Sequence, residues 1–123
     1  MRKGALRAIL ALAAVALSCA PEPAATDPIA RGRQVYGQLG CATCHEPGLA
    51  NLFRPVGPPL DHIGTVGATR RPGLSGEDYI RQSILDPGTY VVPGYPDSMP
   101  RGLGDRLPPE DLDALVRYLA SLR

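Results

Sequence analysis

The chain has 123 residues, enough for one domain of ordinary size and too few for two. Its formal charge is +1, and without Arg2, Lys3 and Arg7 near the start, 10 arginines stand against 12 acidic residues, a charge of −2. This balance excludes the basic surface of a nucleic-acid-binding protein. The composition of 14 glycines, 14 prolines, one Phe, five Tyr and no Trp predicts a loop-rich domain with a thin core, which suits folding around an apolar prosthetic group.

Residues 1–18 have the pattern of an export signal. A positive start is followed by an unbroken apolar run from Ala8 to Leu17. This run is too short to span a bilayer and has the length of a signal-peptide core. The alternative is a buried helix of the mature domain.

Cys19 follows the leader directly and is one of three cysteines in the chain, the others being Cys41 and Cys44. The stretch Ala16-Leu17-Ser18-Cys19 resembles a bacterial lipoprotein processing site, although Ala16 and Leu17 stand in the reverse of the usual order. We therefore expect lipid attachment at Cys19, with cleavage to a soluble protein or an uncleaved anchor as alternatives. Residues 20–28 are rich in proline and lack apolar periodicity, which predicts a semi-extended tether between the lipid and a domain spanning 29–123.

The first predicted helix runs from Ile29 to Leu39, with Asp27 as its N-cap and Pro28 in its first turn. Gly32 and Tyr36 share one face of this helix. A glycine inside a helix is unfavourable by about 1 kcal/mol relative to alanine. Close approach of a second helix would explain it, and composition noise is the alternative.

Two more helices are predicted, and no strand. One begins after Ser75, with Asp78 in a capping-box-like position, and ends at Pro87. The other begins near Pro109 and carries one apolar stripe. Glycines and prolines predict loops over residues 46–69 and 88–107. The fold class is therefore all-α.

Cys41-Ala42-Thr43-Cys44-His45 is the chemically most informative stretch. Two thiols three residues apart, followed directly by His, form the attachment signature of covalent haem. On a helical turn both sulfurs lie on one face, and the imidazole can bind the iron. A redox disulfide, half of a zinc site and chance are the alternatives. A zinc site would need further ligands, and only Cys19 and His62 remain.

The second axial ligand has few candidates. Once the leader is removed, Met99 is the last methionine and His62 is the one histidine besides His45. An iron held by His45 therefore has Met99, His62, a weaker ligand or nothing on its other face. A lone methionine is also a common core filler, and an exposed loop imidazole is the simpler interpretation of His62.

Residues 29–122 resemble the mono-haem c-type cytochromes of the small, His/Met-ligated class. The resemblance rests on Cys41-Ala42-Thr43-Cys44-His45, Gly57-Pro58-Pro59-Leu60, Met99-Pro100, and the Gly32/Tyr36 and Leu115/Tyr118 pairs. It implies three or more helices wrapped round one covalent haem, with the first and last helices crossing at Gly32. The stretch from Tyr79 to Pro100 is similar to cytochrome c domains fused to subunit II of haem–copper oxidases.

The resemblance also implies roles for single residues. His45 and Met99 would ligate the iron, a carbonyl at Pro58 would accept the His45 ring proton, and Leu60 would pack on the porphyrin. The remaining candidates for contact with the haem or its propionates are Arg70, Arg71, Tyr90 and Tyr95, with solvated surface or core packing as the alternatives.

The expected function is electron transfer, without enzymatic activity, in a respiratory-type chain. The expected partners are a redox donor and an acceptor similar to a terminal oxidase, together with a membrane bound through the lipid. The expected location is periplasmic, at the outer face of the cytoplasmic membrane. A fixed subunit of a larger oxidoreductase is one alternative, and a gas-binding or peroxidatic haem protein with a labile sixth ligand is another.

Overall fold

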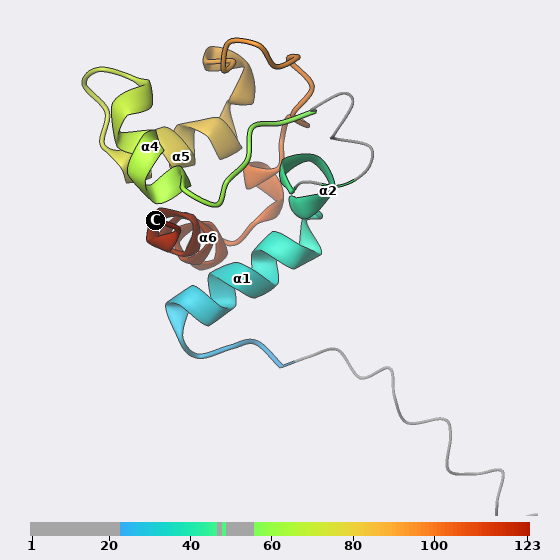
Figure 1. Cartoon of the computed structure of the whole chain (residues 1–123). Coiled ribbons are helices and arrows are strands. Elements are labelled where there is room, and N and C mark those ends of the chain that lie inside the picture. Colours follow the sequence, from blue (N-terminus) through green and yellow to red (C-terminus); the bar gives the residue numbers. More distant parts are fainter. Residues whose placement is uncertain (1–22, 47, 49–55) are drawn as a thin grey trace, which may run out of the picture.

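The computed structural model describes residues 23–46, 48 and 56–123, and over these residues it contains helices and no strand (Figure 1). The leader at 1–18 and Cys19 lie outside the described residues. The α-helices are α1 (Pro28–Gln38), α2 (Ala42–His45), α4 (Ile63–Arg70), α5 (Gly76–Leu85) and α6 (Pro109–Ser121), and two short 3-10 turns are η1 (Pro87–Thr89) and η2 (Gly104–Arg106). The all-α class is confirmed. No helix of this described part is long and apolar enough to cross a membrane.

The predicted starts of α1 and α5 are confirmed, because the side chains that cap them are in place, and α6 begins at Pro109 as predicted. The Asp27 carboxylate accepts a hydrogen bond from the Ala30 amide at 2.7 Å, and Pro28 opens α1. At α5, the Ser75 hydroxyl accepts from the Asp78 amide at 3.1 Å. Each cap satisfies an amide that the first helical turn would leave without a partner.

The loop predicted over residues 46–69 is partly wrong, because α4 occupies Ile63–Arg70. Two glycines in this stretch were interpreted as helix breakers, but both lie inside the helix and lie close to a neighbouring element. A Cβ at Gly64 would overlap the carbonyl of Ala120 in α6, and one at Gly67 would lie 3.3 Å from the Tyr79 ring. Tertiary packing therefore outweighs the low helix propensity of glycine here.

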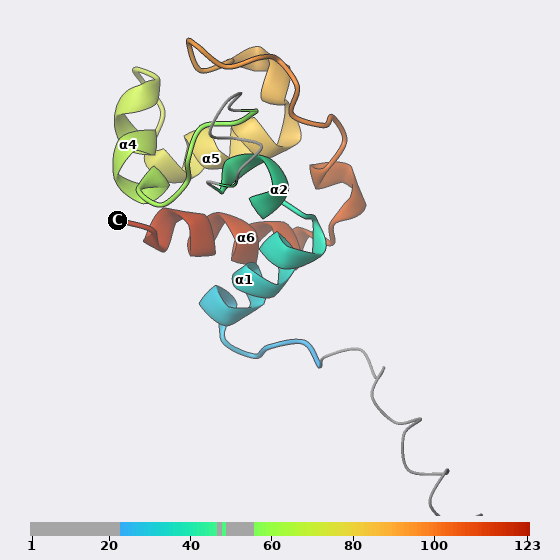
Figure 2. The same cartoon turned by 45° about the vertical axis from the view of Figure 1, so that its right-hand side comes forward.

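Helix α6 is the centre of the fold, with α1 on one side of it and α4 and α5 on the other (Figure 2). Gly32 is where α1 and α6 meet, because a Cβ there would overlap the Ala114 carbonyl and lie 2.5 Å from Cβ of Tyr118. The rings of Tyr36 and Tyr118 pack edge to face beside it, with centroids 5.6 Å apart. The predicted close approach of a second helix at Gly32 is thus confirmed.

The described core is small and is built largely from α6. Val35, Leu115 and Val116 are its most deeply buried large side chains. The start of α4 is joined to the end of α6 by a hydrogen bond from the Gly64 amide to the Leu122 carbonyl at 2.8 Å. This core leaves one side of the molecule to be closed by loops, which is where the cavity described below lies.

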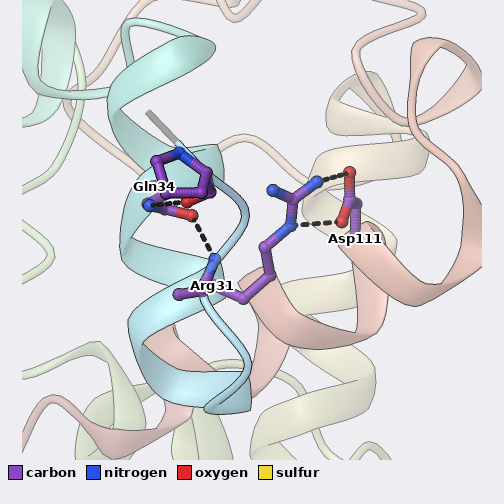
Figure 3. Close-up of polar contacts among 5 residues, drawn as sticks. Arg31, Gln34 and Asp111 are labelled. Carbon is purple, nitrogen blue, oxygen red and sulfur yellow. Dashed lines mark hydrogen bonds and ion pairs between the residues drawn. The ribbon is translucent and has the colours of Figure 1, made fainter. Parts of the chain in front are cut away.

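A two-pronged ion pair also joins α1 to α6 (Figure 3). Nε and Nη2 of Arg31 donate to the two carboxylate oxygens of Asp111, each at 2.7 Å. Hydrogen bonding to Asp111 is the main cause that raises the pKa of Arg31. Because the fork fits a carboxylate in one orientation only, this pair fixes the rotation of α1 against the first turn of α6.

The described part of the predicted tether is held against α1. The Gln34 side chain accepts from the Ala25 amide at 2.9 Å and donates to the Pro23 carbonyl at 3.2 Å (Figure 3). One amide side chain therefore pairs with the backbone on both sides of Ala24, as a neighbouring strand would. Pro23 and Ala25 of the predicted tether are thus hydrogen-bonded to α1.

Candidate functional site

A cavity that opens to solvent lies between α2, α5, α6 and the loop that follows α5. Figure 2 shows this loop running from the end of α5 around the side of the molecule to the start of α6. The lining is predominantly apolar, so the cavity suits a hydrophobic group better than a polar substrate.

The paired cysteines face this cavity from α2. Cys41 stands at the N-cap position of α2 and Cys44 lies within it, and both line the cavity together with His45. Gly40, with φ of +69°, makes the turn that separates α2 from α1. Burial is the main cause that raises the pKa of the Cys41 thiol. The motif spacing predicts that both sulfurs lie on one face of a helical turn, and in the structure both cysteines line the same cavity.

His45 is oriented by the backbone carbonyl of Pro58. Nδ1 of the imidazole lies 2.7 Å from this oxygen. Since a carbonyl can only accept, Nδ1 carries the proton and Nε2 keeps its lone pair available for a metal. The contact predicted between Pro58 and His45 is present.

Gly57 is a functional residue whose role the sequence reasoning missed. A Cβ at this position would lie 2.9 Å from both Nδ1 and Cε1 of His45. The backbone therefore passes against the imidazole where no side chain fits. The signal was available in Gly57-Pro58-Pro59, where a glycine directly precedes the residue expected to accept the His45 proton.

Tyr36 holds the segment that follows His45. Its hydroxyl donates to the Glu46 carboxylate at 3.4 Å. Burial, and after it the Glu46 charge, raise the pKa of Tyr36, so the phenol remains protonated. The tyrosine that packs α1 against α6 thus also contacts the residue after the imidazole.

Met99, Leu60, Tyr90 and Tyr95 line the same cavity as His45. Both the late loop and the early attachment motif therefore face one space. The lining residues that sequence reasoning did not assign to the site are the inward-facing apolar positions of the helices, chiefly Ile63, Ile80, Ile84, Leu115 and Leu119. Their helical periodicity indicates burial but does not distinguish a protein core from a cavity wall.

Neither arginine candidate lines the cavity, and the two differ in their contacts. The guanidinium of Arg71 donates to Gln82 at 2.7 Å and lies over the Tyr90 ring, 5.6 Å from its centroid. Nη1 of Arg70 is buried without a hydrogen-bond partner among the described residues. A buried cationic donor without an acceptor is unfavourable, so Arg70 is suited to an anionic group that the protein alone does not supply.

His62 does not belong to the site. Its side chain is 65% exposed beside Asp61 at 3.4 Å, and it is absent from the cavity lining. Across 23–46, 48 and 56–123, no group of three or more His, Cys, Asp or Glu side chains could hold a metal ion. The zinc interpretation of the cysteine pair therefore finds no support in this part of the chain.

These residues fit a covalently bound haem. Two thiols, an imidazole with a free Nε2 and a thioether meet at one apolar cavity. In a comparison with protein families, the cytochrome c family model matches residues 29–123. Searches among curated proteins and among solved structures found no match.

Proposed function

Because the chain belongs to the cytochrome c family, whose members bind haem c covalently and generally carry electrons, we propose that it transfers single electrons on one haem c. The haem would be bound through Cys41 and Cys44, with His45 and Met99 as axial ligands. The observation that carries this proposal is that both thiols, the oriented imidazole and the Met99 thioether line one cavity.

When bound, haem c supplies one-electron chemistry at its iron. The side chains of this protein decide what that chemistry is used for. With His45 on one face and Met99 on the other, no coordination position is left for a substrate. A thioether ligand raises the reduction potential relative to a second imidazole. The apolar lining acts in the same direction, since it disfavours the additional charge of ferric iron.

Pro58 and Arg70 have separate tasks in this proposal. The Pro58 carbonyl keeps the proton of His45 on Nδ1, so that the Nε2 lone pair would be free to bind the iron. Arg70, with its buried unpaired Nη1, is the better candidate to bind a haem propionate. Arg71 already contacts Gln82 and Tyr90 and would support the site indirectly.

Replacement of Met99 by alanine tests the axial ligation. In the unmodified ferric protein we expect the weak far-red absorption of a Met-ligated haem. Met99→Ala should abolish this absorption and allow carbon monoxide to bind the ferrous form, because one coordination position opens. His62→Ala is the matched control and should leave both properties unchanged. If the unmodified protein already binds carbon monoxide at neutral pH, the gas-binding or peroxidatic alternative is favoured instead.

We further propose that the protein is exported and held at the outer face of the cytoplasmic membrane by lipid on Cys19. Its redox partners there would include an acceptor similar to a terminal oxidase. The support is the leader pattern at 1–18 and the similarity of residues 79–100 to oxidase-fused domains. Two or more acyl chains would give stable anchoring, whereas one alone binds reversibly.

The intact mass of the protein isolated from native membranes tests the anchor. The expected mass is that of a chain beginning at Cys19, plus one haem and acyl chains. A mass without acyl chains would contradict the anchor while leaving the haem assignment intact. Stoichiometric co-purification with an oxidoreductase would favour the alternative of a fixed subunit over a separate carrier.

A further inference from the structure

The loop that carries Met99 has no regular secondary structure between η1 and η2. Met99 itself is half-buried, and Asp97, Ser98 and Pro100 beside it are exposed. The backbone hydrogen bonds before Met99 are short turns, from the Tyr95 amide to the Val92 carbonyl and from the Ser98 amide to the Pro96 carbonyl. Side chains supply further contacts of this loop.

Arg101 closes the loop across Met99. Its Nη2 donates to the Asp97 carboxylate at 2.9 Å, which joins the residues two before and two after Met99. The guanidinium is 59% exposed and the carboxylate 47% exposed, so this ion pair lies on the surface. An exposed pair alone contributes little to stability, and its effect here depends on what else Arg101 contacts.

The same guanidinium packs on Gly88 in η1, at the end of α5. A Cβ at Gly88 would overlap Nη2 of Arg101 and would lie 3.3 Å from its Cζ and 3.5 Å from its Nε. Gly88 is not among the glycines with positive φ. The end of the Arg101 side chain therefore occupies the space that a side chain at Gly88 would take.

A second contact between this loop and the end of α5 lies three residues after Arg101, at Gly104. A Cβ at Gly104 would overlap Cδ2 of Leu85, the last residue of α5. On its other side the loop meets the segment that orients His45, since the Ser98 hydroxyl lies 3.4 Å from the Val56 carbonyl. Met99 thus lies on a loop attached to the end of α5 at two points and in weaker contact with Val56.

From these contacts we infer that Arg101 is a positioning residue for Met99, bracing its loop against Gly88 and so holding the thioether at the haem iron. The inference rests on the proposed Met99 ligation. Arg101 itself does not touch the reacting atoms. Its action is on the equilibrium between a closed loop and an open one, and an external ligand that binds the open form reports that equilibrium.

The test uses the haem-loaded ferric protein and imidazole as the competing ligand. Imidazole displaces the thioether when it binds, and the loss of the far-red absorption measures this binding. Arg101→Gln should tighten imidazole binding about two- to fivefold, the range that one exposed ion pair commands. The control is Arg106→Gln, which removes an exposed arginine of η2 in the same loop and should leave imidazole affinity unchanged. Because Arg101 is exposed, neither variant alters the core.

A double-mutant cycle with Gly88 tests the packing contact. When Arg101 is intact, Gly88→Ala should also tighten imidazole binding, because the added methyl displaces the guanidinium. In an Arg101→Ala background the same change should have no effect. Equal effects of Gly88→Ala in both backgrounds, or unchanged affinity in Arg101→Gln, would overturn the brace. Absence of the far-red absorption in the unmodified protein would instead overturn the Met99 ligation on which the brace depends.

Discussion

Gly32→Ala is expected to destabilise the haem-loaded protein by about 1–3 kcal/mol or more, because overpacking of a close contact forces the backbone apart. The added methyl would overlap the Ala114 carbonyl and lie 2.5 Å from Cβ of Tyr118, and both atoms belong to a helix that cannot withdraw without disturbing the core. Denaturant unfolding followed by far-ultraviolet circular dichroism measures the change in free energy of unfolding.

Gly37→Ala is the matched control for this prediction. Gly37 lies in the same helix α1, and a Cβ there would meet nothing within 4 Å. The substitution should stabilise the protein by about 0.5–1 kcal/mol through helix propensity alone. If Gly32→Ala were also stabilising, the crossing of α1 and α6 could not be as close as the structure has it.

Gly57→Ala is expected to weaken the bond between His45 and the iron. The new Cβ would lie 2.9 Å from Nδ1 and Cε1, so that either the ring tilts or the Pro58 carbonyl moves away. Loss of such a supporting partner typically weakens a metal–ligand bond by about 10- to 100-fold. Protons compete with iron for the imidazole, so a weaker bond is lost at higher pH. The acid midpoint at which the ferric low-spin spectrum disappears should therefore rise by about 1–2 pH units.

Gly37→Ala, whose added Cβ would meet nothing within 4 Å, should leave this acid midpoint unchanged. An unchanged midpoint in Gly57→Ala would mean that the backbone at Gly57 can move away from the ring at no cost to ligation. Loss of the far-red absorption at neutral pH would instead indicate that the disturbance reaches Met99.

The helix starts could be predicted from the sequence because capping is local. Asp27 and Ser75 each bond to an amide three residues further along the chain, so the relevant partners lie within one turn. Helix α4 could not be predicted in this way. Its glycines are poor helix formers in isolation, and their reason lies in Ala120 and Tyr79, which are distant in sequence. For the same reason, the role of Gly32 can be explained only by its contacts with residues of α6, which are distant in sequence.

The residues of the site also differ in whether local sequence or distant contacts determine their roles. Cys41, Cys44 and His45 form a contiguous motif whose chemistry can be predicted from spacing alone. The difference between Arg70 and Arg71 depends on Gln82 and Tyr90, which take up one guanidinium and leave the other unmatched. Adjacent residues of the same type give no sequence signal for such a difference.

The central place of α6 has a consequence for the order in which the molecule is made. Leu115 and Leu119 of this last helix form part of the cavity wall, and the rest of the fold packs around the same helix. Until residues 109–121 have been synthesised and docked, the thiols of Cys41 and Cys44 stand in a site with one wall missing. Contacts between elements so distant in sequence require closure of a long loop and therefore form slowly. A covalent attachment step therefore has access to both sulfurs before the domain closes, and docking of α6 afterwards encloses the attached group.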